Sequence, residues 1–217
     1  MQKSYTSKDL ISLTLDKNTK LGDLRKLAAA IKKDHALAIQ LWQSGGFMTR
    51  QLSILIMDKK LLQEAAINKL VEDIDSHPQQ EKLQLIDWLM ANQLMKDKQT
   101  IAIIESWVNS NSILKRRVFW YYQGRLRWVG QTPPNNTAQL LELIEARIAN
   151  EHPDVQWAMN FTAAQVGIFD SSYRSRCIAL GEKTGLYKDE VVAKNCTPNY
   201  LPKYIAIQVA KLEKTSK

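Results

Sequence analysis

Hydrophobic residues recur along most of the chain with the spacing of an amphipathic α-helix. In residues 21–33, Leu24, Leu27, Ala28 and Ile31 fall at positions i, i+3, i+4 and i+7, on one helix face. The same spacing predicts helices over 35–44, 47–58, 63–75, 78–94, 99–109, 112–129, 138–150, 155–168, 171–185 and 200–214. Residues 186–199 look irregular. No segment shows sustained alternation of hydrophobic and polar residues, so the predicted fold class is all-α.

The predicted helices are of moderate length and are joined by short connections, which is typical of antiparallel helix pairs. This many pairs in one chain favours an α-solenoid of stacked antiparallel pairs, a HEAT-like or ARM-like superhelix. We expect residues 1–217 to form a single domain of this kind. Residues 132–136, Thr-Pro-Pro-Asn-Asn, form the one linker-like loop. The chain shows no internal self-similarity, so a globular helical bundle is the alternative.

The composition is that of an ordinary globular protein, with 45% hydrophobic and 24% charged residues among 217. Eight Gly and six Pro are few for a β-sandwich or a Gly-rich nucleotide-binding fold. The longest aliphatic runs are too short to span a membrane, and the N-terminus has no apolar signal region. We therefore expect a cytoplasmic protein, and we also expect it to be a monomer. Cys177 and Cys196 are interpreted as free thiols, with a disulfide between them as the alternative.

Familiar catalytic motifs are missing from the sequence. The three histidines are far apart, so no zinc-ligand spacing occurs, and we expect no metal and no cofactor. There is no phosphate-binding Gly-Lys-Ser/Thr loop, no dinucleotide fingerprint and no nucleophile-elbow serine.

The net charge of +8 and the pI of about 9.4 favour a polyanionic partner. The cations are clustered: residues 17–33 carry six cations and one acid, and residues 111–130 carry five cations and no acid. Residues 203–217 are also rich in lysine, whereas residues 63–91 are acidic. This distribution predicts a nucleic-acid-binding surface, and a merely solvated charged face is the alternative.

The sharpest cluster is Lys115-Arg116-Arg117, near the N-terminus of its predicted helix, where a phosphate group is favoured. Trp120 and Tyr121 follow Arg116 and Arg117 by four residues, so we expect the aromatic rings to stack on the guanidinium groups. These three cations, together with Lys26 in the first basic stretch, are the predicted nucleic-acid-binding residues.

Two of the six tryptophans lie beside polar groups. Trp88 shares a helix face with Asn92, four residues later, and Trp157 is flanked by the amides Gln156 and Asn160. For either tryptophan alone, a packed aromatic ring with a polar neighbour is the alternative interpretation.

Taken in order, several segments make the chain resemble the AlkD-like family of DNA alkylation repair proteins, which are HEAT-like α-solenoids. The resemblance extends from about residue 18 to 209 and is carried by residues 22–28, 34–42, 88–95, 157–160, 177–181 and 196–197. Active members of that family are monofunctional DNA glycosylases that release purines alkylated at N3 or N7.

The resemblance implies that the chain binds double-stranded DNA carrying alkylated bases in a basic concave groove. Trp88 and Trp157 would lie against the deoxyribose of the lesion, and Arg117 would contact a nearby phosphate. The catalytic Asp of the family falls at Asn92, whose amide cannot carry a negative charge or take a proton from water. The alternative function is that of a non-catalytic helical-repeat scaffold that binds protein or nucleic acid.

Overall fold

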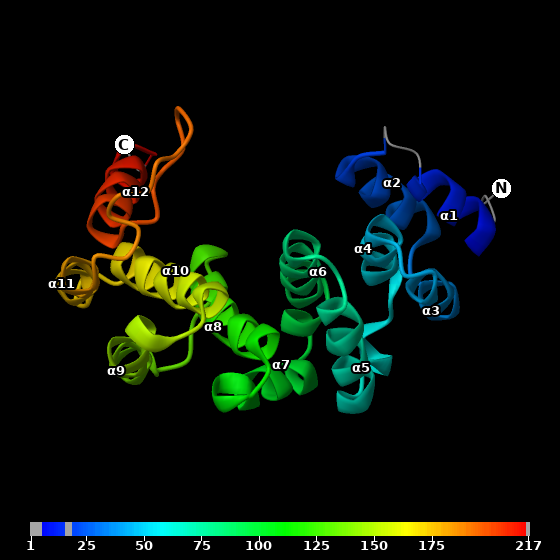
Figure 1. The fold of residues 1–217 in the computed structure, drawn as a ribbon, viewed down its shortest axis with the longest axis horizontal. Coiled ribbons are helices and arrows are strands. Elements are labelled where there is room, and N and C mark those ends of the chain that lie inside the picture. Colours follow the sequence, from blue (N-terminus) through cyan, green and yellow to red (C-terminus); the bar gives the residue numbers. More distant parts are fainter. Residues whose placement is uncertain (1–5, 16–18, 216–217) are drawn as a thin grey trace. The chain divides into compact units, whose positions relative to one another are not determined.

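The computed structural model describes residues 6–15 and 19–215, and its regular elements in these ranges are all helices (Figure 1). The chain divides into two compact units, Met1–Trp107 and Val108–Lys217. That both units act as one domain stays a prediction. The basic residues Lys17 and Lys217 lie outside the described residues.

The first unit contains seven α-helices, joined in places by short 3-10 turns, within the described residues. They are α1 (Ser7–Leu15), α2 (Leu21–Ile31), α3 (His35–Gln43), α4 (Phe47–Ile56), α5 (Glu64–Asp75), α6 (Gln79–Asn92) and α7 (Lys98–Glu105). Helix α4 is the centre of this unit, because it packs against α1, α2, α3 and α6. Gly45, with a φ of +77°, makes the tight turn that brings α4 back onto α3.

A polar network inside this first unit joins three helices. The indole Nε1 of Trp42 donates to Asp73 Oδ2 over 2.8 Å, and Nη1 of the buried Arg50 donates to the main-chain oxygen of Asp73. The guanidinium of Arg50 also lies 4.8 Å from the Trp42 ring centroid. Trp42 is therefore a structural residue that fixes α3 and α4 to α5.

The described residues of the second unit form five α-helices, which are α8 (Ile113–Trp128), α9 (Thr137–Arg147), α10 (Pro153–Phe169), α11 (Arg174–Thr184) and α12 (Leu201–Thr215). Helices α8 and α10 lie side by side and make the most extensive helix contact of the unit (Figure 1). Helices α9, α11 and α12 pack around α10, which is buried along most of its length. Cys177 in α11 is buried and Cys196 is exposed, and both are free thiols as expected.

The predicted helices all occur, with ends shifted by a few residues. Helix α1 was missed, although Thr6 and Asp9 form a reciprocal capping pair, in which each side chain accepts from the backbone N–H of the other. Helix α6 ends at Asn92, and Leu94 follows in a separate 3-10 turn. Helix α10 is capped by His152, whose Nδ1 accepts from the Asp154 N–H.

Candidate nucleic-acid interface

Trp88 and Asn92 lie together near the C-terminal end of α6, as their spacing predicts. Asn92 Nδ2 donates to the main-chain oxygen of Trp88 over 2.8 Å, one turn earlier in the helix. The indole Nε1 of Trp88 donates to the main-chain oxygen of Gln51 in α4 over 3.2 Å. Both side chains are half-buried, so Trp88 is held in place by α4 while part of it stays open to solvent.

The open part of Trp88 carries a cation from α2. The guanidinium carbon of Arg25 lies 5.0 Å from the Trp88 ring centroid, and Arg25 is itself exposed. A cation over an indole face is attracted by the ring quadrupole, most strongly when water is excluded. The contact therefore joins the basic helix α2 to the predicted site on α6.

A shallow basic hollow of about 320 Å³ lies beside Arg25. Its lining is Arg25, Ala28, Ala29, Lys32, Lys33 and Leu55. The two alanines leave room between the cations, so a phosphate group can approach the helix closely. Lys26, predicted to bind nucleic acid, is exposed one residue after Arg25 and lies 3.6 Å from Asp23. We name the exposed cations of α2 and of the two residues that follow it, Arg25, Lys26, Lys32 and Lys33, the α2 basic face.

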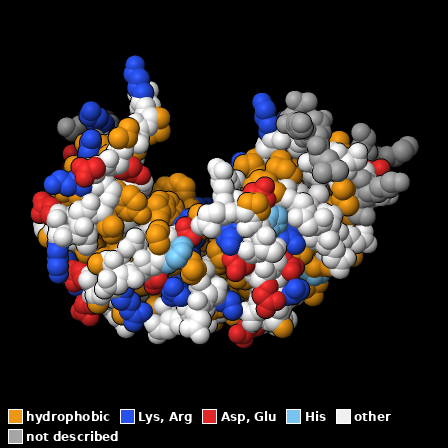
Figure 2. Space-filling view, viewed as in Figure 1, with side chains coloured by type: hydrophobic (Ala, Val, Ile, Leu, Met, Phe, Trp, Pro, Cys, Tyr) orange, Lys and Arg blue, Asp and Glu red, His pale blue; other side chains and the backbone are white. Residues whose placement is uncertain are grey.

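Side chains of α8 and α10 form an aromatic–arginine cluster in the second unit. Its members are Arg117, Tyr121, Trp157 and Phe161. The guanidinium carbon of Arg117 lies 4.5 Å from the Trp157 ring centroid, and Trp157 stacks on Phe161 with centroids 5.6 Å apart and planes 9° from parallel. Tyr121 contacts both rings, at 5.6 and 5.1 Å. Figure 2 shows hydrophobic side chains gathered over α8 and α10 on this side of the unit.

Arg117 is held rigidly in this cluster. Its Nη1 donates to the main-chain oxygen of Asp154 over 2.9 Å, and only 5% of the residue is exposed. Asp154 and Trp157 both belong to α10, so the hydrogen bond and the stacking contact fix the Arg117 side chain against the same helix. A phosphate contact by this nearly buried side chain stays a prediction.

The close approach of α8 and α10 depends on Gly124. A Cβ at this position would lie 2.7 Å from the Phe161 ring and 3.0 Å from the backbone Cα of Thr162. Thr162 Oγ1 in turn donates to the main-chain oxygen of Trp120, across the same helix pair. The absence of a side chain at 124 is what lets the ring of Phe161 lie against α8 and extend the stack.

The rest of the predicted cationic run has a different environment. Arg116 forms a two-pronged ion pair with Glu151, at 3.1 and 2.8 Å, instead of stacking on an aromatic ring. Trp120, its expected partner, is buried in the core and makes an edge contact with Phe119 at 4.9 Å. Lys115 is half-buried. The run is thus a set of anchored side chains and not an exposed basic patch, and phosphate contacts by Lys115 and Arg116 stay predictions.

The ion pair of Arg116 changes the titration of its partner. Burial by itself raises the pKa of the Glu151 carboxyl. The hydrogen bonds from Arg116 and from the His152 N–H lower the pKa by more than burial raises it, so the net pKa lies below its usual value. Glu151 therefore stays ionised into moderately acidic solution and keeps the start of α8 attached to the segment before α10.

The polar neighbours of the two tryptophans have structural roles. Asn160 is buried and its Nδ2 donates to the main-chain oxygen of Asn199, which holds the irregular segment 186–199 against α10. Gln156 donates to the main-chain oxygen of Ile148.

The acidic groups that the structure describes offer no further site. Asp97 caps α7 by accepting from the Gln99 N–H. In the described part of the chain, no group of three or more His, Cys, Asp or Glu side chains could hold a metal ion.

Two residues of these sites were missed by sequence reasoning. Arg25 contacts Trp88 from a helix 63 positions away in the sequence, and no spacing rule connects them. Phe161 could have been found, because it lies four residues after Trp157 and therefore on the same face of α10. The structure thus brings together Trp88, Asn92 and Arg25 in one unit, and Arg117 and Trp157 in the other. That all of these line a single groove stays a prediction.

Comparisons with known proteins identify the family and the fold of the chain. The model of the DNA alkylation repair enzyme family matches residues 18–180. A search of curated proteins gave no match. A solved structure, described as belonging to a new family related to the HEAT-like repeat DNA glycosylases with affinity for branched DNA structures, superposes with a TM-score of 0.67. It is 18% identical, over 97% of this chain and 88% of that one, so the likeness shows the fold.

The fold match confirms the expected all-α, HEAT-like architecture and decides against an unrelated globular bundle. Among the described residues, no helix is both long enough and apolar enough to cross a membrane. The family model covers about three quarters of the sequence, including both tryptophans, Asn92 and the cationic run. The chain belongs to the DNA alkylation repair enzyme family.

Proposed function

We propose that this protein binds DNA through the α2 basic face with Trp88, and through the aromatic–arginine cluster of α8 and α10. The observation that carries the proposal is that both tryptophans singled out by the sequence hold a guanidinium on the ring, at 5.0 and 4.5 Å. Cations supply the affinity for the phosphate backbone, and aromatic faces contact sugar or base. Family membership supports DNA as the polyanion.

We further propose that the protein is a weakened glycosylase whose activity is limited at Asn92. A purine alkylated at N3 or N7 is cationic, so its glycosidic bond is already weakened, and the departing base leaves an oxocarbenium-like sugar. Aromatic faces stabilise such a cation, but a nearby carboxylate does more, because it also orients the attacking water. Losing one well-placed electrostatic group costs about 10²–10³ in rate.

Asn92→Asp tests this proposal directly. A carboxylate cannot donate to the main-chain oxygen of Trp88 as the amide does, so the new side chain is released from that bond and can turn toward a bound sugar. Release of N7-methylguanine and N3-methyladenine from duplex DNA should rise by about 10-fold to 10²-fold. The matched control is Gln84→Glu, which makes the same amide-to-carboxylate change at an exposed position of α6.

Three outcomes of this assay are distinct. A gain confined to Asn92→Asp supports a glycosylase site that lacks its carboxylate. No release above spontaneous depurination by either protein, with DNA binding intact, overturns the glycosylase proposal. An active wild type that Asn92→Asp leaves unchanged shows that a different carboxylate does the chemistry.

A non-catalytic DNA-binding role is the second candidate, and a specific observation favours it. The Asn92 amide is engaged with the backbone of its own helix, which is a stable arrangement that needs no substrate. The structurally similar protein is described by its affinity for branched DNA structures. Comparing the affinity of this chain for a four-way junction and for a duplex of equal length would separate the two roles. Tighter binding to the junction without base release supports the second candidate.

A further inference from the structure

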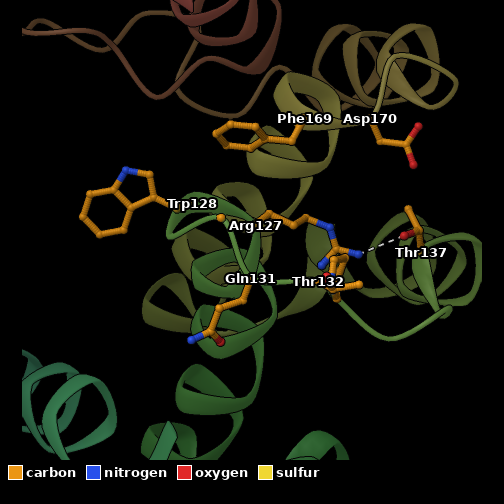
Figure 3. A pocket seen from close by; sticks show the side chains of 9 residues that line it. Arg127, Trp128, Gln131, Thr132, Thr137, Phe169 and Asp170 are labelled. Carbon is orange, nitrogen blue, oxygen red and sulfur yellow. Dashed lines mark hydrogen bonds between the residues drawn. The ribbon is translucent and has the colours of Figure 1, made fainter. Parts of the chain in front are cut away.

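A pocket of about 460 Å³ opens where α8 and α10 end, within the second unit (Figure 3). Trp128 is the last residue of α8 and Phe169 is the last residue of α10. The loop that follows α8 completes the lining with Gly130, Gln131, Thr132 and Pro133. The volume falls within the range of pockets that hold small organic ligands.

Two aromatic rings form the apolar walls of this pocket. Trp128 is 54% exposed and Phe169 is 48% exposed. Among the described residues, the other large hydrophobic side chains with comparable exposure are all leucine or valine. Figure 3 shows the Phe169 ring above and the Trp128 ring to the left of the opening. Leaving two large rings in water next to each other is unfavourable unless a flat partner covers them.

The Trp128 ring is held in position before any ligand arrives. Its edge meets Phe161 with centroids 6.4 Å apart and planes at 87°, and the guanidinium of Arg125 lies 5.0 Å from its centroid. An exposed ring that is fixed in this way loses little conformational entropy when a ligand stacks on it.

The other end of the pocket is polar and also fixed. Arg127 is buried, and its guanidinium donates to the main-chain oxygen of Gln123 and to Thr137 Oγ1. Asp170 Oδ1 accepts from the N–H and the hydroxyl of Ser172. Figure 3 shows Arg127, Thr137 and Asp170 on the side of the pocket away from Trp128. A strong donor and a strong acceptor therefore share one end.

These features select among ligand classes. The opposite charges of Arg127 and Asp170 offset each other, so a simple cation gains little here. A phosphate group is disfavoured because two helices end at this place, and helix C-termini carry partial negative charge. A flat, uncharged heteroaromatic ring with both donors and acceptors on its edge satisfies the rings and the polar end together.

We propose that this pocket binds an unpaired purine base of DNA, with the base against Trp128 and Phe169 and its polar edge toward Arg127 and Asp170. The inference rests on the proposed DNA binding and adds a second site at the C-terminal ends of α8 and α10, which adjoins the aromatic–arginine cluster through the contact of Trp128 with Phe161. A base that is already unpaired costs little to extrude from the helix, so the pocket favours DNA with bulges or unpaired ends over perfect duplex.

The test uses the full chain and two duplexes of the same sequence and length, one fully paired and one with a single bulged 2-aminopurine. The wild type should bind the bulged duplex about 10-fold more tightly, and the fluorescence of 2-aminopurine should fall as it stacks on the rings. Phe169→Ala should remove both effects and leave the affinity for the paired duplex unchanged. Leu61→Ala, at an exposed leucine of the first unit, is the control.

The outcomes separate this inference from the proposed function. Equal affinity for both duplexes with no change in fluorescence overturns the pocket but leaves DNA binding standing. Loss of affinity for both duplexes in Phe169→Ala also overturns it, because the ring would then belong to the general DNA surface. Binding to neither duplex by the wild type removes the proposed function as well. If Phe169→Ala impairs folding, Phe169→Leu gives the same test, because leucine keeps an apolar side chain but removes the flat ring on which the base stacks.

Discussion

The two tryptophan–arginine pairs of the proposed DNA interface, Arg25 with Trp88 and Arg117 with Trp157, look alike in composition but differ in how the arginine is held. Arg25 lies exposed on α2, and its contact with the Trp88 ring is the interaction that places it. Arg117 is 5% exposed, is bonded to Asp154 and lies on a tryptophan that itself stacks on Phe161. The arginine of the second unit is fixed in advance, but its charge has to be removed from water. The arginine of the first unit stays in water and can change conformation when a ligand binds.

The largest expected difference between the pairs is in stability. Arg117→Ala removes a desolvated cation–π contact and a charged hydrogen bond, and should lower the free energy of unfolding by about 3 kcal/mol. Arg25→Ala removes an exposed contact and should cost about 0.5 kcal/mol. Urea unfolding followed by circular dichroism measures both. Equal losses would show that the burial of Arg117 does not matter.

Glycines on the two arginine-bearing helices provide the next test. Gly124→Ala places a methyl group against Phe161 and the backbone of Thr162, and should destabilise the protein by about 1–3 kcal/mol. Gly22→Ala in α2 meets no atom within 4 Å and should stabilise by about 0.5–1 kcal/mol, because alanine is the better helix former. The melting temperatures of the two variants, measured by thermal unfolding, show whether each substitution stabilises or destabilises the protein. A neutral Gly124→Ala would mean that α8 and α10 can move apart without loss.

Acid stability should also differ between the units. The pKa of Glu151 is lowered in the folded state, so the pair with Arg116 stabilises the protein above the unfolded pKa of about 4.5. That contribution is lost as the pH falls through the lower folded value. Glu151→Gln should remove about 1 kcal/mol of stability at pH 7 and make the variant less sensitive to acid between pH 5 and pH 3.

The exposed ion pair of Asp58 with Lys33 is the matched control in the first unit. Asp58 also has a lowered pKa, first because its carboxylate accepts from the Lys60 N–H. It lies at the surface, so Asp58→Asn should change the acid profile less than Glu151→Gln does. An equal change in the two variants would show that the partial burial of the Arg116–Glu151 pair does not increase its contribution to stability.

The sequence predicted the parts of this molecule that depend on local periodicity. The heptad-like spacing in α2 and the spacing of Trp88 and Asn92 on α6 are properties of a single helix, and both predictions hold. The partner of Arg117 could not be predicted this way. Trp157 lies 40 residues further along, on another helix, and reaches Arg117 because Gly124 lets α8 and α10 approach closely.

The error at Arg116 has a similar cause. Spacing within α8 pointed to Trp120, but the packing of α8 turns that ring into the core and leaves Arg116 facing Glu151 before α10. A run of three cations was therefore interpreted as a surface patch, although Arg116 is paired with Glu151 and Arg117 is held by Asp154 and Trp157. The irregular segment 186–199 shows the same limit, because it is fixed by Asn199 bonding to Asn160 and Glu190.

The smallest expected effect concerns the adaptable arginine and its phosphate. Arg25→Ala should weaken binding to paired DNA about threefold, which corresponds to about 0.7 kcal/mol. The slope of log affinity against log salt should fall in magnitude by about 0.9, since one phosphate contact is lost. Arg25→Lys keeps the charge and should keep the slope. Lys98→Ala removes a cation from the start of α7 and is the control for net charge alone. If Lys98→Ala and Arg25→Ala weaken binding equally, the effect belongs to the total charge of the protein, and the pairing of Arg25 with Trp88 has no special part in holding DNA.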